Sequence, residues 1–367
     1  MDGHGIRPSD EPTHSPTRSI VKTVVYIWRL VVEVSATTIF LGFNFLVPTI
    51  TRALLDMGGI RFSPAQDIPS LAGKIILVTG GNAGLGKQTV LYLAQHAPKR
   101  IYLAARTASK ASSAIAEIEK AVPNASIEHL PLDLTSFSSI RDAASTFRAK
   151  ESRLDILINN AGVMATPYSL TKDGYEIQFG TNHMGHALLT KLLLPTLLDT
   201  AKEPGSDVRI VNISSMGHMM APSGGMIWDQ AALEKQYTWR RYGQSKLANI
   251  LFTNELAARY PQITSVSIHP GVIVTDLYTS LKSNFILNVL LGFYQLLTPI
   301  LPGHYKSPEG GALNQTWAAT TPKDKLKNGE FYTPVGKTGS GSKLSHDQGL
   351  GMKLWEYTEE EFAKHGY

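Results

Sequence analysis

Residues Ile75–Gly86 constrain the fold of this chain more than any other stretch. They read IILVTGGNAGLG, an apolar run that passes directly into a glycine-rich turn, and helix-forming residues follow from Lys87 to Ala94. A continuous apolar run bounded by turn residues is typical of a strand buried on both faces of a parallel sheet. Glycines let the backbone approach a ligand closely, and the N-terminus of the following helix favours an anion. The stretch therefore predicts a strand–turn–helix unit that cradles a phosphate.

The spacing of this turn differs from the usual dinucleotide fingerprint G-x-G-x-x-G. It reads Thr79-Gly80-x-x-x-Gly84-Leu85-Gly86, with Asn82 inside the three-residue gap. A glycine cluster by itself also occurs as a plain tight turn between a strand and a helix. The choice between a structural turn and a cofactor site therefore depends on the rest of the chain.

Composition limits the classes of protein that need to be considered. The chain has 367 residues, of which 43% are hydrophobic and 18% charged, enough for a large buried core and unlike a disordered protein. The net charge of +5 is spread along the chain without a basic run interleaved with aromatic residues, which argues against nucleic-acid binding. The absence of cysteine excludes disulfides, thiolate metal sites and cysteine nucleophiles. No His, Asp or Glu spacing indicates a metal site.

The N-terminal part changes character abruptly. Residues 1–19 are polar and aperiodic and predict a disordered tail, whereas residues 20–57 are strongly hydrophobic. Within them, Leu30–Ile50 is long enough for a spanning helix, which needs about 20 mainly apolar residues. We expect attachment to a membrane of endoplasmic-reticulum type, spanning or interfacial, on a side that the flanking charges do not define. The alternative is an amphipathic helix packed on the domain or on a dimer surface.

After a predicted linker at residues 58–70, strands and helices alternate through residues 71–335. This alternation predicts an α/β, Rossmann-type domain with a doubly wound parallel sheet. The strands after the first are expected at Arg100–Ala105, Ser126–Leu132, Leu154–Ile158, Asp207–Ile213 and Thr264–His269. The helices between them are expected at Lys110–Val122, Ser138–Ala149, Tyr175–Leu198 and Tyr242–Arg259. Residues 336–367 are predicted to form a tail with a short helix near Leu354–His365.

The residues best suited to carry out a reaction lie in the second half of the chain. A predicted strand ends in Ser214 and Ser215, and Tyr242 and Lys246 follow on one face of a predicted helix with i, i+4 spacing. A lysine ammonium favours the phenolate and lowers the pKa of a neighbouring tyrosine. Such a tyrosine can exchange a proton with a carbonyl or carbinol oxygen, and the Ser215 hydroxyl can hold that oxygen.

Together these motifs resemble the short-chain dehydrogenase/reductase family over roughly Leu71 to Pro334. Within that family the phrases NNAGVM, TNHMGHALLT and HPGVIVTDL look most like the retinol-dehydrogenase-like members. The matching motifs are Thr79-Gly80-x-x-x-Gly84-Leu85-Gly86, Asn159-Asn160-Ala161-Gly162, Asn182 in TNHMGH, Ser215 in IVNISS, Tyr242-x-x-x-Lys246, and Pro270-Gly271 followed by Thr275.

The resemblance implies a catalytic tetrad of Asn182, Ser215, Tyr242 and Lys246. Tyr242 would be the general acid/base and Ser215 would stabilise the substrate oxygen. Lys246 would tune the pKa of Tyr242 and hold the nicotinamide ribose. Asn182 would carry a water that links Lys246 to solvent.

The resemblance also implies a set of contacts to a dinucleotide. Asp133 would contact the adenine, Asn160 would lie along the cofactor, and Ile273 and Thr275 would contact the nicotinamide amide and the phosphates. The full expected set is Gly80, Asn82, Gly84, Leu85, Gly86, Arg106, Asp133, Asn160, Tyr242, Lys246, Ile273 and Thr275. For Asp133, a position at the start of the following helix is the plainer alternative.

The charge after the second strand bears on which dinucleotide is used. NAD enzymes of this fold normally place an acidic residue there for the ribose hydroxyls. This chain has Ala105 followed by Arg106, and a guanidinium suits a 2′-phosphate. The sequence therefore predicts NADP(H). Lys87 would add a second positive charge, or it is simply a solvated helix residue.

Two apolar segments indicate the kind of substrate. Met216–Trp239 is rich in Met, Trp and Gly, and Thr279–Tyr305 would form a lid, a core segment or an oligomer contact. An apolar, Met-lined pocket suits a lipophilic alcohol or its carbonyl compound. Two alternatives stay open: a sugar-nucleotide epimerase or dehydratase that shares Tyr-x-x-x-Lys, and a non-catalytic dinucleotide-binding scaffold. The resemblance further suggests a homodimer through the helices that bear Asn182 and Tyr242.

The remaining polar residues near these motifs have plainer interpretations. His183, His186 and His218 are expected to be structural histidines. Arg240 and Arg241, directly before Tyr242, are expected to form a solvated helix start.

Overall fold

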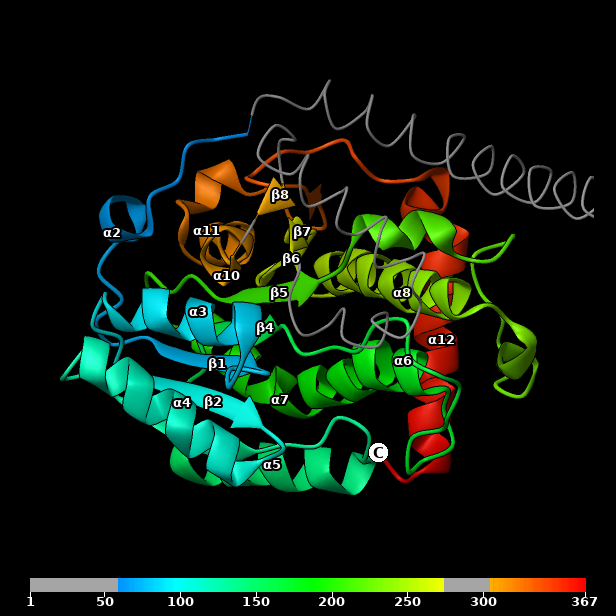
Figure 1. The fold of residues 1–367 in the computed structure, drawn as a ribbon, viewed down its shortest axis with the longest axis horizontal. Coiled ribbons are helices and arrows are strands. Elements are labelled where there is room, and N and C mark those ends of the chain that lie inside the picture. The colour runs from blue at the N-terminus through cyan, green and yellow to red at the C-terminus, as the bar shows by residue number, and fades with distance from the viewer. Residues whose placement is uncertain (1–58, 274–303, 306) are drawn as a thin grey trace, which may run out of the picture. The chain divides into compact units, whose positions relative to one another are not determined.

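The computed structural model describes residues 59–273, 304–305 and 307–367. The described strands are β1 Ile75–Thr79, β2 Arg100–Ala105, β3 Ile127–Pro131, β4 Ile156–Asn159, β5 Arg209–Ile213, β6 Thr264–Ile268, β7 Val272–Ile273, β8 His304–Tyr305 and β9 Phe331–Tyr332. The described helices are α2 Pro64–Asp67, α3 Gly84–Ala94, α4 Ala108–Ala121, α5 Phe137–Lys150, α6 Ile177–Phe179, α7 Gly185–Ala201, α8 Thr238–Arg259, α10 Pro308–Gly311, α11 Leu313–Thr320 and α12 Gln348–Lys364. Figure 1 shows their arrangement.

Seven of these strands form one parallel sheet in the order β3-β2-β1-β4-β5-β6-β9. The order reverses direction between β1 and β4, and in open sheets of this type ligands bind at the carboxyl ends of the strands beside that switch point. The predicted α/β fold with a doubly wound parallel sheet is confirmed. The two-residue strands β7 and β8 pair separately from it.

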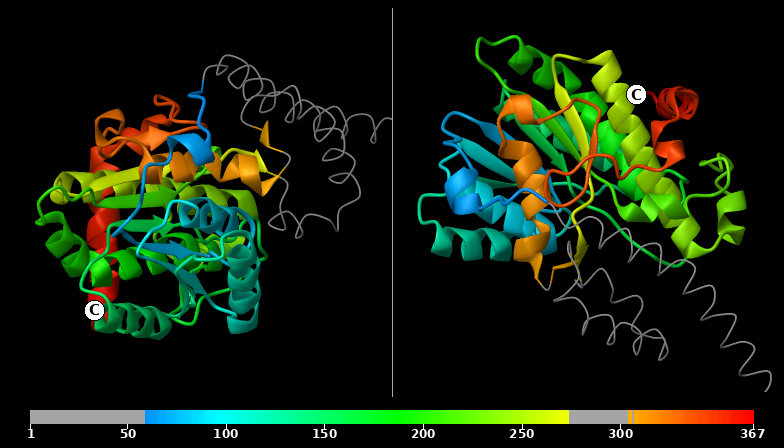
Figure 2. Two further views of the ribbon diagram at one scale, coloured as in Figure 1. Left: turned by 90° about the vertical axis from the view of Figure 1, so that its left-hand side faces the viewer. Right: turned by 90° about the horizontal axis from the view of Figure 1, so that it is seen from above.

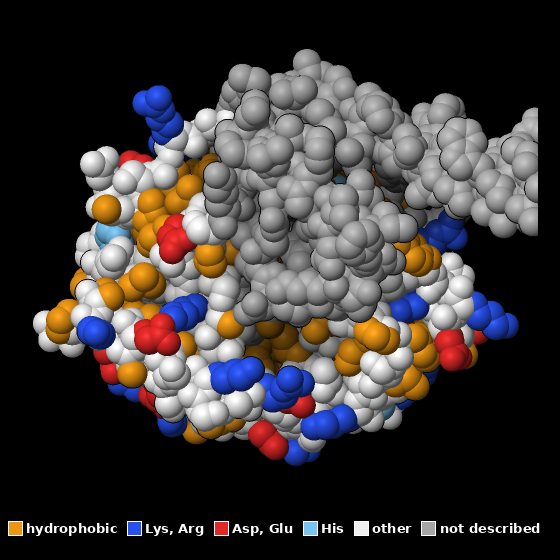
Figure 3. Space-filling model, viewed as in Figure 1, with side chains coloured by type: hydrophobic (Ala, Val, Ile, Leu, Met, Phe, Trp, Pro, Cys, Tyr) orange, Lys and Arg blue, Asp and Glu red, His pale blue; other side chains and the backbone are white. Residues whose placement is uncertain are grey.

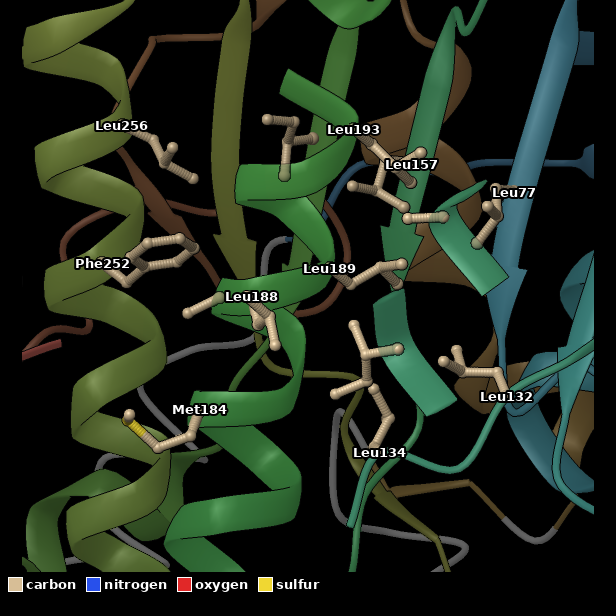
Figure 4. Packing of buried hydrophobic residues seen from close by; sticks show 14 of the residues in the cluster. Leu77, Leu132, Leu134, Leu157, Met184, Leu188, Leu189, Leu193, Phe252 and Leu256 are labelled. Carbon is tan, nitrogen blue, oxygen red and sulfur yellow. The ribbon is translucent and has the colours of Figure 1, made fainter. Parts of the chain in front are cut away.

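Helices cover both faces of the sheet (Figures 1 and 2). The reason lies in the alternation of side chains along each strand. Ile75 and Leu77 of β1 join a core with α5, α7, α8 and α12, whereas Ile76 and Val78 join a core with α3 and α11. Figure 4 shows the first of these cores, with leucines of α7 lying between the sheet and Phe252 of α8. The continuous apolar run was therefore interpreted correctly as a strand buried on both faces.

One predicted helix differs from the structure. The sequence predicts a continuous helix over Tyr175–Leu198, but the chain forms α6, then a π-helical turn at Gly180–Met184, and only then α7. The wider turn contains Asn182, whose side chain bonds to the backbone of Val163. Single π turns of this kind are frequent at functional sites.

Both ends of the described region carry more structure than the sequence suggests. Residues 58–70, expected as a linker, contain α2 and the buried Ile68. The C-terminal helix α12 is longer than expected, and Leu354 and Phe362 are buried in the core beside α8. Its burial depends on contacts distant in sequence, which a local amphipathic pattern does not identify.

The N-terminal tail at 1–19 and the hydrophobic segment at 20–57 lie outside the described residues, as does most of Thr279–Tyr305. Within the ranges that are described, no helix is both long and apolar enough to cross a membrane. On the face shown in Figure 3, Lys and Arg side chains are interspersed with Asp and Glu.

Candidate active site

The turn after β1 forms the first wall of the site. Gly80 has φ +66° and Gly84 has φ +51°, a conformation that L side chains rarely adopt. A Cβ at Gly86 would lie 2.2 Å from the Gly80 carbonyl oxygen, so this position admits no side chain. Ala83 precedes α3 and offers no side-chain cap, while a Cβ added at Gly84 would meet nothing within 4 Å. The turn thus leaves open space at an uncapped helix N-terminus, as an anion site requires.

Asn160 fastens this turn to the end of β4. Its side-chain amide donates to the Thr79 carbonyl oxygen at 2.8 Å, and its backbone N–H donates to Thr79 Oγ1 at 2.9 Å. Gln315 of α11 donates in turn to Asn160 Oδ1 at 3.1 Å. Asn160 thus lies beside the expected cofactor path, and its side-chain amide bonds to the Thr79 backbone and to the Gln315 side chain.

Charged residues follow the ends of β2 and β3. Arg106 is exposed directly after β2. Lys87 of α3 forms an ion pair with Glu117 of α4, so its charge already has a partner. Burial raises the pKa of Asp133, but hydrogen bonds from Thr135 and from Lys172 outweigh it and leave the pKa below its usual range. Asp133 is therefore an ionised group at the sheet edge.

The π turn and α8 bring three of the tetrad residues together. The Asn182 side chain donates to Ser245 Oγ at 2.9 Å, next to Lys246. The Lys246 ammonium lies 5.8 Å from the centre of the Tyr242 ring and donates to the carbonyl oxygen of Ile213 at 2.9 Å. All three side chains are buried. The i, i+4 spacing of Tyr242 and Lys246 does place them on one helix face.

Ser215 completes the group from the end of β5. Its Oγ accepts the Gly217 N–H at 3.0 Å, and a Cβ placed at Gly217 would lie 3.2 Å from that oxygen and 2.7 Å from the Tyr242 ring. Ser215 and Tyr242 thus flank the same glycine. In the bond from Gly217 the Ser215 hydroxyl acts as acceptor through a lone pair, and this leaves its O–H hydrogen for a bond to another group.

Burial is the dominant electrostatic influence on Lys246. Desolvation lowers its pKa from 10.5 to about 8. The side chain is therefore mainly an ammonium at neutral pH and loses its proton more readily than an exposed lysine.

An apolar wall adjoins the Tyr242 ring. Met164, Ala165 and Tyr242 form one buried hydrophobic cluster, against which Met220 and Trp239 pack. The Trp239 and Tyr242 rings meet edge to face with centroids 6.1 Å apart. Ala165 has φ +52°, and its N–H donates to Gln178 at 2.9 Å. A strained non-glycine residue held by its surroundings is a feature of ligand-facing loops.

The expectation that Arg241 is solvated is wrong. Its side chain is only 5% exposed and pairs at 3.1 Å with Glu176, which is fully buried. The same guanidinium donates to the carbonyl oxygens of Thr166 and Gln236. Burial raises the pKa of Glu176, and its bonds from Phe179 and Gln178 and the charge of Arg241 oppose that rise. The adjacent Arg240 is exposed, as predicted.

This ion pair is a positioning feature that sequence reasoning missed. Arg241 directly precedes Tyr242 and ties the start of α8 to the loop that carries Met164 and Ala165. Helix periodicity does not reveal it, because Glu176 lies 65 positions earlier in the chain. The only local sign is two adjacent arginines, of which one faces inward.

The histidines near the site are structural, as expected. His183 Nε2 lies 3.1 Å from Thr358 Oγ1, and His218 accepts the Ser342 N–H at 3.1 Å while its Nδ1 lies 2.8 Å from the Ser215 carbonyl oxygen. His186 lies between Thr79 and Asn182. Burial lowers the pKa of His183 to about 3 and that of His186 to about 4. Among the described residues no group of potential ligands is arranged to hold a metal ion.

These buried histidines predict acid sensitivity. Below about pH 6.5 the unfolded chain takes up protons at His183 and His186 that the folded chain does not take up until about pH 3 and about pH 4. The free energy of unfolding should therefore fall as the pH drops from 6.5 towards 4, by up to about 1.4 kcal/mol per pH unit for each histidine. Urea denaturation at pH 7 and pH 5 measures this slope. A slope that His183→Phe leaves unchanged would contradict the assignment.

Two expected cofactor residues cannot be placed with the others. Ile273 belongs to the short strand β7, directly after the Pro270-Gly271 turn. Thr275 lies outside the described residues. The remaining expected residues all lie on the turn after β1, at the carboxyl ends of β2 to β5, or on the π turn and α8.

Comparison with known proteins agrees with this arrangement. Residues 74–285 match the family model of short chain dehydrogenases. The chain is 39% identical to the short-chain dehydrogenase/reductase drtF of Aspergillus calidoustus, covering 81% of this chain and 96% of the relative. It is also 39% identical to retinol dehydrogenase 11 of Mus musculus, over 87% of this chain and 95% of the relative.

A solved structure has a similar fold. The RhlG/NADP active-site complex of Pseudomonas aeruginosa aligns with a TM-score of 0.57 and 26% identity, covering 73% of this chain and 96% of that one. The fold therefore has its explanation in common descent. The chain belongs to the short-chain dehydrogenase/reductase family, with retinol dehydrogenases among its relatives, and is an oxidoreductase that acts on CH–OH groups with a nicotinamide dinucleotide.

Proposed function

We propose that this protein interconverts a lipophilic alcohol and its ketone or aldehyde with NADP(H) as the cofactor. The observation that carries the proposal is that a group able to exchange a proton lies next to an apolar surface. The Tyr242 ring lies 5.8 Å from the buried Lys246 ammonium and packs in the apolar cluster of Met164, Ala165, Met220 and Trp239. An apolar pocket with a few polar groups is the usual form of a site for such substrates.

The residues of the turn fit a dinucleotide phosphate. Gly84 leaves open space beside an uncapped helix N-terminus, which suits the pyrophosphate. Gly80, Asn82, Leu85 and Gly86 would complete this cradle, with Asn160 fastening it. When bound, NADP(H) supplies the hydride that is transferred.

The preference for NADP(H) rests on Arg106. Its exposed guanidinium follows β2, and within the part of the chain that the structure describes it has no hydrogen-bond or ion-pair partner. Lys87, in contrast, is paired with Glu117. Arg106 would therefore be the main partner of a 2′-phosphate. Asp133 would contact the adenine, and Ile273 and Thr275 the nicotinamide side.

Each tetrad residue has a task that its geometry supports. Tyr242 would donate a proton to the carbonyl oxygen in reduction and accept one from the alcohol in oxidation. Lys246 would stabilise the tyrosinate by its charge and hold the ribose hydroxyls. Ser215, whose O–H remains to donate, would hold the substrate oxygen. Asn182 would keep a water at the inner end of the site.

The proposal includes attachment to a membrane, which rests on the hydrophobic composition of residues 20–57. Deletion of residues 1–57 should release the protein from membranes, as fractionation would show. A homodimer through α7 and α8 would have to accommodate α12, which packs beside α8.

The function is tested by following NADPH absorbance against a panel of lipophilic ketones and aldehydes. We expect NADPH to be consumed with apolar carbonyl compounds, and NADH to be used roughly tenfold less efficiently or worse, the effect of one charge-assisted contact. Equal use of NADH would contradict the cofactor assignment.

The same assay separates the alternatives. Conversion of a sugar nucleotide without net NADPH consumption would favour an epimerase or dehydratase. Binding of NADPH without turnover of any compound in the panel, by a protein that unfolds cooperatively, would favour the scaffold.

A further inference from the structure

We propose that His186 is a positioning residue that joins the phosphate-cradling turn to the Asn182 side of the tetrad. This inference rests on the function proposed above. His186 lies in the first turn of α7, and its ring reaches two separate parts of the site. Its Nε2 lies 2.9 Å from Thr79 Oγ1, at the end of β1, and its Nδ1 lies 3.0 Å from the backbone carbonyl oxygen of Asn182.

The roles of the two ring nitrogens follow from chemistry. The ring is buried and neutral: desolvation and, to a smaller extent, the charge of Lys246 lower its pKa, the hydrogen bond to the Asn182 carbonyl opposes them, and the resulting pKa is about 4. A neutral imidazole has one N–H and one lone pair. The Asn182 carbonyl oxygen can only accept, so Nδ1 carries the hydrogen. Nε2 therefore offers its lone pair to Thr79, and the Thr79 hydroxyl must donate.

Because the Thr79 hydroxyl donates to His186, its oxygen acts as acceptor in its other hydrogen bonds. With its hydrogen turned to His186, both lone pairs remain to accept, and they receive the backbone N–H groups of Asn160 at 2.9 Å and Ala161 at 3.0 Å. The carbonyl oxygen of Ile158 is a more distant acceptor for the hydroxyl, at 3.5 Å. His186 thus orients a side chain that, together with Asn160, holds the segment after β4 against the cradle.

The other contact lies beside the proton-exchanging group. The Asn182 side chain is fixed by Val163 and Ser245, and its backbone belongs to the π turn. His186 Nδ1–H fixes that carbonyl oxygen. One buried ring therefore makes the position of Asn182 depend on the position of the cradle, although the two come from different elements.

His183, three residues earlier in the π turn, provides a comparison. It is as deeply buried as His186, but its Nε2 faces Thr358 of α12, away from Thr79. If His186 were only a core residue, replacing either histidine by Phe should have the same consequences.

The test uses the full chain and measures NADPH binding by fluorescence, thermal stability, and turnover of a carbonyl substrate. We expect His186→Phe to weaken NADPH binding about tenfold, the effect of losing one buried hydrogen bond, while His183→Phe lowers stability and leaves the Kd for NADPH unchanged. His186→Gln, which returns an acceptor at the level of Nε2, should restore most of the affinity. His186→Asn, whose amide reaches only the level of Nδ1, should not.

A double-mutant cycle tests the pairing itself. Thr79→Val should weaken NADPH binding at least as much as His186→Phe, because it also removes the acceptor of the Asn160 and Ala161 N–H groups. The double variant should lose less than the product of the two single effects, because both single variants already lack the bond between His186 and Thr79. The proposal is overturned if the effects of the two single variants on the Kd for NADPH multiply in the double variant. It is also overturned if His186→Phe and His183→Phe have the same Kd for NADPH. If His186→Phe does not fold, the contrast between the Gln and Asn variants decides the question. Failure of the wild-type chain to bind NADPH would instead overturn the cofactor assignment, and this inference with it.

Discussion

Replacement of Tyr242 by Phe is expected to reduce carbonyl reduction about 10³-fold while NADPH binding is retained. The hydroxyl is the only group lost, so the proton would have to reach the substrate oxygen from water. The ring keeps its packing against Met164, Ala165 and Trp239, and the fold should be unaffected. Turnover is measured by NADPH absorbance and binding by NADPH fluorescence.

Tyr237 provides the matched control for this experiment. It lies in the same region, directly before α8, but its side chain is 67% exposed. Tyr237→Phe should leave both turnover and binding at the wild-type level. Unchanged turnover in Tyr242→Phe, with NADPH still bound, would refute the assignment of Tyr242 as the general acid/base.

Replacement of Arg241 by Met is expected to lower the free energy of unfolding by about 3–5 kcal/mol, the usual cost of leaving one member of a buried ion pair alone. Glu176 would then be fully buried without its cationic partner. The carbonyl oxygens of Thr166 and Gln236 would also lose a donor. Urea denaturation measures the change, and we expect turnover to fall as well because Tyr242 follows Arg241 directly.

The neighbouring Arg240 is exposed and serves as the control. Arg240→Met should change stability by no more than about 0.5 kcal/mol, as surface substitutions usually do. Removing both charges, with Glu176→Met and Arg241→Met together, should recover part of the loss because no uncompensated charge remains. Equal destabilisation by the Arg240 and Arg241 variants would show that the ion pair has no special role.

Strands β1 to β6 of the sheet could be predicted from sequence because their signals are local, whereas the two-residue strand β9 was not predicted. The apolar run of β1 and the bounds of β2 depend on residues adjacent in the chain, and β2 was predicted at Arg100–Ala105, where the structure has it. The face shared by Tyr242 and Lys246 follows likewise from the period of the helix. The alternation of strands and helices then predicts that the strands are parallel.

The internal connections of the site could not be predicted in this way. The bonds from His186 to Thr79 and from Arg241 to Glu176 join residues 107 and 65 positions apart. No pattern within one helix or strand specifies such partners, because they depend on how the elements pack. The π turn was missed for a related reason, since the Asn182 side chain turns towards Val163 on a different segment.

The position of α12 bears on the order in which this protein acquires its structure during synthesis. Trp355 of α12 stacks on Phe252 of α8 with centroids 5.6 Å apart, and Arg259 lies over the same indole. Until α12 has emerged from the ribosome, the outer face of the helix that carries Tyr242 and Lys246 lacks its cover. A nascent chain that already contains the whole tetrad therefore exposes apolar surface of the kind that chaperones bind. Assembly of the site is in this sense a late event, completed by a segment that contributes no residue to the chemistry.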